Sequence, residues 1–210
     1  MQACVVDTGG ANLTSITNAI ERLKIDFVIS DKAADIKGAT HVILPGVGSA
    51  KPIMDKLIKC NLIETIKNIK TPLLGICLGM QILFDYLEED DISGLGVITG
   101  PVLKFPNDFN LSIPHMGWNQ LEIKDNNTQL FQNINTKSYV FFAHSYYVPI
   151  NKYTISETSY GFEYSSSVNC NNFFGVQFHP EKSGEIGSSI FKNFFRSEEH
   201  TSELQSRPHI

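Results

Sequence analysis

The sequence predicts an α/β fold, in which a mostly parallel sheet is flanked by helices and additional antiparallel strands follow in the second half. Two observations lead to this prediction. In the first half, short apolar runs alternate with stretches whose apolar residues recur at helical spacing, as they do in parallel α/β sheets. From about residue 97 to residue 177, strand-like segments follow one another and are separated by turn residues, which is typical of antiparallel strands.

The first half contains four expected strands, each a short and mainly apolar run. They lie at residues 3–6, 27–29, 41–44 and 72–76. Asn12 can cap a helix whose apolar positions run from residue 13 to residue 23. Apolar spacing also predicts helical structure between residues 54 and 66 and a helix at residues 78–87. This alternation favours a parallel sheet with helices on both faces.

The second half contains five expected strands and a closing helix. The strands lie at residues 119–123, 139–142, 153–156, 163–168 and 173–177. The helix at residues 186–195 has apolar residues four positions apart. No repeat or long linker divides the chain, so we expect one domain at residues 1–196. Residues 197–210 are polar and resemble a translated sequencing adapter, so we interpret them as a non-native or disordered tail.

Composition excludes several classes of function. The net charge is -5 and no run of Lys or Arg exceeds a pair, which argues against nucleic acid or a membrane surface as the main partner. The scattered cysteines form no Cys-x-x-Cys pair, so we expect no metal, no cofactor and no disulfide framework. They are Cys4, Cys60, Cys77 and Cys170. Free cysteines, with no signal-like start and no apolar stretch of about 20 residues, predict a cytoplasmic protein.

Residues 75–79 read Gly-Ile-Cys-Leu-Gly and join an apolar run to a predicted helix, which is the pattern of a nucleophile elbow. The glycines permit a sharp turn that holds Cys77 in a strained backbone. The start of the following helix favours a thiolate at Cys77, and the amide of Leu78 is expected to donate to an oxyanion. The alternative, an inert buried cysteine, stays open on this motif alone.

A second motif, Phe178-His179-Pro180-Glu181, follows the last expected strand. Pro180 pushes His179 into an extended conformation, and if Glu181 is also extended, the two side chains project to the same side. Glu181 could then accept from one imidazole nitrogen while the other acts as a base. The elbow and this tripeptide together predict a Cys77–His179–Glu181 triad rather than a solvated histidine.

Residues 45–48, Pro-Gly-Val-Gly, end the third expected strand. They could form a plain turn, or they could direct a backbone amide at an oxyanion. The elbow on a neighbouring strand favours the second interpretation, because parallel sheets carry their sites at the carboxyl ends of the strands.

In this order, the motifs resemble those of the class I, triad-type glutamine amidotransferases over residues 4–195, nearly the whole chain. Finer motifs resemble one branch of that family, the glutaminase subunits of imidazole glycerol phosphate synthase. These motifs occupy residues 7–13, 44–48, 75–81, 114–119, 142–146 and 175–183. The resemblance implies a flavodoxin-like form of the α/β fold.

The resemblance also implies roles for individual residues. Cys77 would attack the glutamine carboxamide, His179 would shuttle the proton and Glu181 would orient the imidazole. An oxyanion hole would be formed by Val47, Gly48 and Leu78. Glutamine would be bound by Gly48, Gln81, His144, Ser145 and Tyr146.

The implied partner is a cyclase subunit of (β/α)8-barrel fold, which forms a heterodimer with the glutaminase and uses its ammonia to make imidazole glycerol phosphate and AICAR. The resemblance assigns the interface or its gate to Asn12, Trp118, Asn119, Phe141 and Lys182. The residue types alone suggest less, since Asn12 reads as a helix cap, Trp118 as core or contact anchor and Lys182 as a solvated charge.

Three alternatives remain on the sequence. A paralogous subunit could supply ammonia to a sugar-modifying synthase, and it would keep the same triad. A free-standing cysteine hydrolase would turn over without a partner. A catalytically silent regulatory subunit belongs to a different class, and the intact triad argues against it.

Overall fold

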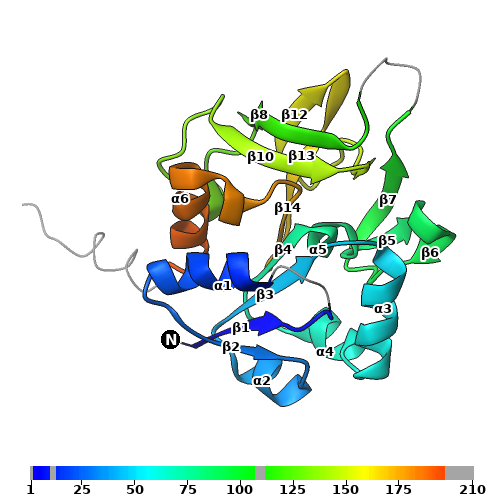
Figure 1. Ribbon diagram of the computed structural model, residues 1–210, viewed down its shortest axis with the longest axis vertical. Helices are drawn as coiled ribbons and strands as arrows, with labels where there is room; N and C mark the ends of the chain where they lie inside the picture. The colour runs from blue at the N-terminus through cyan, green and yellow to red at the C-terminus, as the bar shows by residue number, and fades with distance from the viewer. Residues whose placement is uncertain (1, 10–12, 107–111, 197–210) are drawn as a thin grey trace, which may run out of the picture.

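The computed structural model describes residues 2–9, 13–106 and 112–196. An eight-stranded sheet forms its centre, with the strand order β2-β1-β3-β4-β14-β13-β12-β9 (Figure 1). The strands are β1 (Gln2–Val6), β2 (Asp26–Ser30), β3 (His41–Gly46), β4 (Leu73–Cys77), β9 (Glu122–Ile123), β12 (Thr154–Tyr160), β13 (Phe162–Cys170) and β14 (Phe173–Val176).

Strands β1 to β4 and β14 are parallel, whereas β13, β12 and β9 add to the sheet in antiparallel fashion. Strand β4 lies between β3 and β14. Gly46 of β3 is opposite Cys77 of β4, and Ile76 is opposite Val176 of β14. Parallel strands end at the same edge of a sheet, so three loops meet around Cys77.

Helices cover both faces of this sheet (Figure 1). One face carries α1 (Leu13–Arg22) and α6 (Gly184–Phe194), which pack on Ala3 and Val5 of β1. Cys4 and Val6 point to the other face. That face carries α2 (Ala33–Gly38), α3 (Ala50–Lys59) and α4 (Ile63–Asn68). Successive strand residues alternate between faces, so a strand of uninterrupted apolar residues serves two cores at once.

Two smaller sheets stand beside the central one. Strands β8 (His115–Gln120) and β10 (Tyr139–His144) form an antiparallel pair. The other sheet has the order β11-β7-β5-β6. Its strands are β5 (Phe84–Leu87), β6 (Ile92–Ser93), β7 (Ile98–Lys104) and β11 (Tyr146–Tyr147). Short 3-10 helices lie at Glu89–Asp91, Gln129–Phe131 and Pro180–Lys182.

The predicted helix at residues 78–87 is wrong beyond its first turn. Helix α5 spans only Leu78–Gln81, and the chain then enters β5. The amides of Leu95 and Val97 donate to the carbonyls of Ile82 and Leu83, which commits this backbone to a sheet. An apolar run such as residues 82–84 suits a buried strand as well as a helix, and pairing with a distant segment decides between them.

Two other predicted elements are divided. The helical stretch at residues 54–66 consists of α3 and α4, because the backbone turns at Asn61, which has a φ of 55°. The strand at residues 119–123 consists of the end of β8 and the two residues of β9. The α/β class is as predicted, with antiparallel strands in the second half, but the last strand, β14, pairs in parallel with β4.

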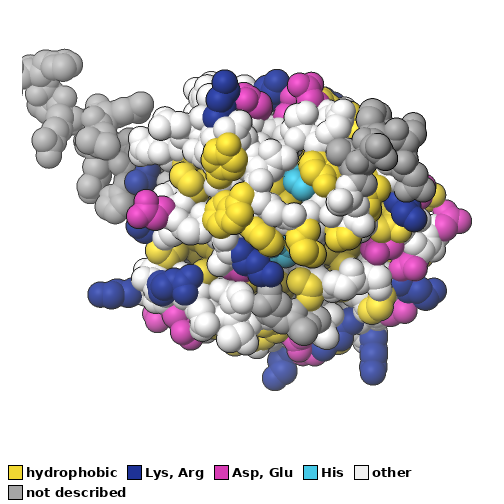
Figure 2. All heavy atoms as spheres, turned by 45° about the horizontal axis from the view of Figure 1, so that its top comes forward, with side chains coloured by type: hydrophobic (Ala, Val, Ile, Leu, Met, Phe, Trp, Pro, Cys, Tyr) yellow, Lys and Arg dark blue, Asp and Glu magenta, His cyan; other side chains and the backbone are white. Residues whose placement is uncertain are grey.

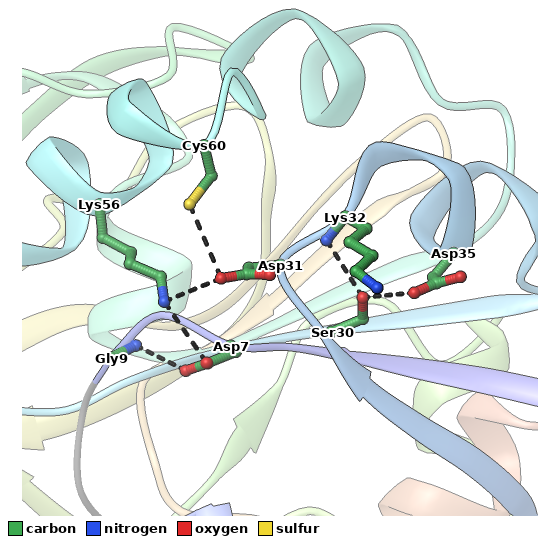
Figure 3. Close-up of polar contacts among 8 residues, drawn as sticks. All are labelled: Asp7, Gly9, Ser30, Asp31, Lys32, Asp35, Lys56 and Cys60. Atoms are coloured by element: carbon green, nitrogen blue, oxygen red, sulfur yellow. Dashed lines mark hydrogen bonds and ion pairs between the residues drawn. The ribbon is translucent and has the colours of Figure 1, made fainter.

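Lys56 of α3 joins the carboxyl ends of β1 and β2 (Figure 3). Its Nζ lies 3.4 Å from Asp7 Oδ2 and 3.1 Å from Asp31 Oδ2. The hydrogen bond to Asp31 raises the pKa of Lys56, and the same bond lowers the pKa of Asp31. This ion-pair cluster holds α3, the helix that follows residues 47–49, against the edge of the sheet where the site lies.

The described residues contain neither a helix long and apolar enough to cross a membrane nor a group of His, Cys, Asp and Glu suited to a metal ion. All four cysteines are free thiols.

Candidate active site

Cys77 stands at the sharp turn between β4 and α5 in a strained backbone conformation, with φ 53° and ψ -112°. Such strain in a residue other than glycine is a mark of functional sites. The flanking glycines are sterically required. A Cβ on Gly75 would lie 2.6 Å from the carbonyl oxygen of Gly79, and a Cβ on Gly79 would collide with the carbonyl oxygen of Leu44. The predicted elbow is therefore built by close backbone packing.

His179 and Glu181 are hydrogen bonded to each other, with 2.8 Å between Nδ1 and Oε1. The His179 amide donates to the carbonyl of Phe141, which ties the backbone of His179 to β10. The second carboxylate oxygen of Glu181 is buried and finds no hydrogen-bond partner among the described residues. From the sequence, an extended backbone is expected at Glu181. Glu181 instead lies in a 3-10 turn, and this turn brings its carboxylate to His179.

The third member of the predicted triad is also brought close. Burial by itself lowers the pKa of His179, but the hydrogen bond and charge of Cys77, and then those of Glu181, raise this pKa to about 10. Because Glu181 occupies Nδ1, the nitrogen that faces Cys77 is Nε2. The contacts of His179 with Cys77 and Glu181 therefore favour the protonated imidazole.

A cavity of about 330 Å³ opens in front of Cys77. Its lining includes all of the residues predicted to form the oxyanion hole and to bind glutamine, namely Val47, Gly48, Leu78, Gln81, His144, Ser145 and Tyr146. Gly48 has a φ of 90°, a conformation that other residues rarely adopt. The volume suits a small molecule of amino-acid size.

The predicted interface residues in the described part of the chain lie on β8, on β10 and in the 3-10 turn after His179. Trp118 is 56% exposed, pairs with Phe141 across β8 and β10, and has its ring 6.1 Å from the Phe141 ring. Lys182 lines the cavity and places its Nζ 5.7 Å above the ring of Phe141. Asn119 is partly buried in β8, and Asn12 lies outside the described residues.

Other large apolar side chains are exposed on the same two strands, among them Met116 and Tyr139. Figure 2 shows hydrophobic side chains gathered on this face of the molecule. An exposed apolar face of this kind is a candidate for contact with another molecule.

Residues 4–197 match the family described as glutamine amidotransferase class-I. The chain belongs to this family. Among curated relatives, the imidazole glycerol phosphate synthase subunit HisH of Buchnera aphidicola subsp. Acyrthosiphon pisum is 48% identical over 195 residues, covering 92% of this chain and 98% of the relative. The HisH subunit of Yersinia pestis is 46% identical with the same coverage.

Solved structures of glutamine amidotransferases have the same fold as this chain. A crystal structure described as a glutamine amidotransferase has a TM-score of 0.70 at 16% identity and covers 91% of this chain and 96% of its own. The glutaminase domain of Trypanosoma brucei CTPS, solved with bound acivicin, has a TM-score of 0.62 at 15% identity, with 92% and 93% covered. The predicted family and fold class are both confirmed.

In this amidotransferase, sequence reasoning missed Glu89, which also lines the cavity. Its Oε2 accepts from the amide of Ala50 at 2.9 Å, at the start of α3. Burial raises the pKa of Glu89, and the charge of the neighbouring Asp90 raises it further. The hydrogen bond from Ala50 acts in the opposite direction. The acidic run at residues 88–91 was visible, but the helix predicted up to residue 87 gave no reason to place it beside the site.

Proposed function

We propose that this chain hydrolyses glutamine to glutamate and ammonia with Cys77, His179 and Glu181, as the glutaminase subunit of an imidazole glycerol phosphate synthase in histidine biosynthesis. One observation carries the catalytic assignment. A strained cysteine faces a buried histidine, and the remote nitrogen of that histidine is bound to a buried carboxylate. This is the arrangement of a nucleophile, a base and an orienting group.

Acylation begins when the Cys77 thiolate attacks the carbon of the side-chain amide of glutamine. The amide of Leu78 and the backbone at Val47 and Gly48 stabilise the oxyanion that develops on the carbonyl oxygen. His179 gives its Nε2 proton to the leaving nitrogen, the C–N bond breaks, and ammonia departs. A glutamyl thioester remains on Cys77.

Deacylation uses the same groups in the opposite sense. Nε2 of His179 now carries no hydrogen, so it takes a proton from a water molecule while the water oxygen attacks the thioester carbon. The C–S bond breaks, glutamate leaves, and the Cys77–His179 ion pair is restored. Over both steps, one glutamine and one water give one glutamate and one ammonia.

Recognition of the amino-acid end of glutamine falls to polar groups across the cavity. The carboxylate of Glu89 suits the α-ammonium group. Both N–H bonds of the Gln81 amide are used, one by the Tyr146 carbonyl and one by Gln177, so Gln81 offers a ligand its carbonyl oxygen. The backbone at Ser145 and Tyr146 provides amides for the α-carboxylate.

The partner subunit would dock on the exposed face of β8 and β10. Aromatic side chains are enriched at interfaces, and the exposed Trp118 packs on Phe141, whose ring lies beneath Lys182 of the cavity lining. We infer that Asn12, Asn119 and Lys182 complete this interface, and that the partner is a (β/α)8-barrel cyclase in a heterodimer. A cytoplasmic location, where thiols stay reduced, is part of the proposal.

The test is glutamate release from glutamine by the purified chain, with and without the barrel cyclase and its nucleotide ligand. We expect the rate of glutamate release to rise strongly when the ligand-bound cyclase is present. Strong turnover by the chain alone would instead indicate a free-standing hydrolase. If no glutamate is released with or without the cyclase, and the cyclase itself uses free ammonia normally, the partner is a different synthase, such as a sugar-modifying one.

A further inference from the structure

Tyr164 of β13 is completely buried, and its hydroxyl bridges two imidazoles. The oxygen lies 3.1 Å from Nδ1 of His115 and 3.2 Å from Nε2 of His144. The two histidines belong to β8 and β10, so one hydroxyl joins three strands. Tyr164 is absent from the cavity lining, whereas His144 is part of it.

The direction of each hydrogen bond can be assigned. The carbonyl of Tyr146 can only accept, so His144, 2.7 Å away, donates from Nδ1. Nε2 of His144 then carries no hydrogen and accepts from the Tyr164 hydroxyl. The Tyr164 oxygen in turn accepts from Nδ1 of His115, whose Nε2 faces the amide nitrogen of Asn119 at 3.4 Å.

This assignment requires both imidazoles to be neutral. Burial lowers the pKa of His144 to about 3 and the pKa of His115 to about 4. Each ring therefore has one donor and one acceptor nitrogen at neutral pH. In both rings the hydrogen resides on Nδ1.

The chain of bonds continues to the nucleophile. The Tyr146 carbonyl also accepts from Nε2 of Gln81 at 3.0 Å, and the same nitrogen donates to Oε1 of Gln177 at 2.9 Å. Nε2 of Gln177 donates to Sγ of Cys77 at 3.7 Å. The backbone at residues 144–146 is thus held from one side by His144 and from the other by Gln81.

We propose that Tyr164 is a positioning residue for the glutaminase reaction, because its hydroxyl donates to Nε2 of His144 and holds this ring, whose Nδ1 fixes the Tyr146 carbonyl and with it the backbone at residues 144–146 that binds glutamine. The inference rests on the proposed function. Without the hydroxyl, Nε2 of His144 is a buried acceptor with no donor, and the ring loses the contact that holds it against the Tyr146 carbonyl. The backbone at residues 144–146 is then held less firmly, and glutamine binds more weakly.

The variant Tyr164→Phe removes only the hydroxyl. In the complex with the cyclase, we expect the KM for glutamine to rise about tenfold, which corresponds to about 1.4 kcal/mol, with a smaller change in kcat. The control is Tyr160→Phe, because the Tyr160 ring stacks on His115 but its hydroxyl bonds elsewhere, to the carbonyl of Ser112. This control should keep the wild-type KM.

A second measurement does not depend on activity. Nitrogen-15 NMR of the imidazoles should show His115 and His144 in the Nδ1–H form in the wild type, and in Tyr164→Phe a shift of the His144 Nε2 resonance, because this nitrogen no longer accepts a hydrogen bond. An Nε2–H form at His144 in the wild type, or an unchanged KM in a folded Tyr164→Phe, would overturn the inference. A wild type that hydrolyses no glutamine would count against the proposed function and leave the NMR result standing.

Discussion

Nδ1 of His179 lies 2.8 Å from Oε1 of Glu181, and the two side chains are only 5% and 1% exposed. A carboxylate this deeply buried acts strongly on its neighbour, because little water screens its charge. It holds the ring orientation and favours the imidazolium that catalysis requires. Because Glu181 uses Nδ1, Nε2 is the nitrogen that exchanges a proton at Cys77.

Glu181→Gln tests the charge of this carboxylate. An amide of the same shape can still accept from Nδ1, but it cannot stabilise the imidazolium. We expect kcat for glutamine hydrolysis to fall by about 10²-fold or more, in the range of general acid–base contributions, with a small effect on KM. Glu185→Gln is the matched control, since Glu185 is an exposed carboxylate in the first turn of α6. Equal kcat values for the two variants would remove Glu181 from the mechanism.

The charge state of His179 gives a prediction about pH. Its pKa is raised from 6.5 to about 10, with Cys77 as the leading cause of the rise, so Cys77→Ala should lower it. A proton-bound His179 stabilises the fold fully below pH 6.5, and this stabilisation is lost as the pH rises through about 10. The wild-type Tm should therefore fall more steeply than the Cys77→Ala Tm over this interval. NMR titration of His179 checks the pKa directly, and equal values in both proteins would show that Cys77 does not raise the pKa of His179.

Local patterns in the sequence suffice for one part of this site. The elbow around Cys77 depends on glycines two positions before and after it, and the His179–Glu181 pair depends on residues two apart. Both are visible in the sequence because the geometry is set by near neighbours.

Contacts between distant segments could not be predicted. Glu89 reaches the cavity because residues 82–84 pair with residues 94–98, and this replaced the predicted helix at residues 78–87. Tyr164 meets its two histidines only after three strands from separate parts of the chain have assembled. A tyrosine in a strand reads as core on its own, and its hydroxyl gains a role only from its partners.

The backbone at Val47 and Gly48, which we propose forms part of the oxyanion hole, can be tested by changing its conformation. Gly48 has a φ of 90° and open space around the position of a Cβ, so Gly48→Ala meets no clash but disfavours this conformation by about 1–2 kcal/mol. We expect kcat to fall about tenfold or more while the fold is retained. Gly38→Ala is the control, because Gly38 also has open space but lies in α2 without a positive φ. Full activity of Gly48→Ala would show that this conformation of the loop is not needed.

Trp118 separates binding of the partner from folding. Its side chain is 56% exposed, so Trp118→Ala should change the free energy of unfolding by no more than about 0.5 kcal/mol. If Trp118 anchors the interface, the same variant should weaken binding of the cyclase by about 2 kcal/mol or more, which is about thirtyfold in Kd. The control is Ile58→Ala on α3, an equally exposed apolar side chain at 59% that lies outside the β8–β10 pair. Calorimetric titration with the cyclase measures both variants. Equal Kd values would place the partner on a different face, because a docked subunit that covers β8 and β10 must bury Trp118.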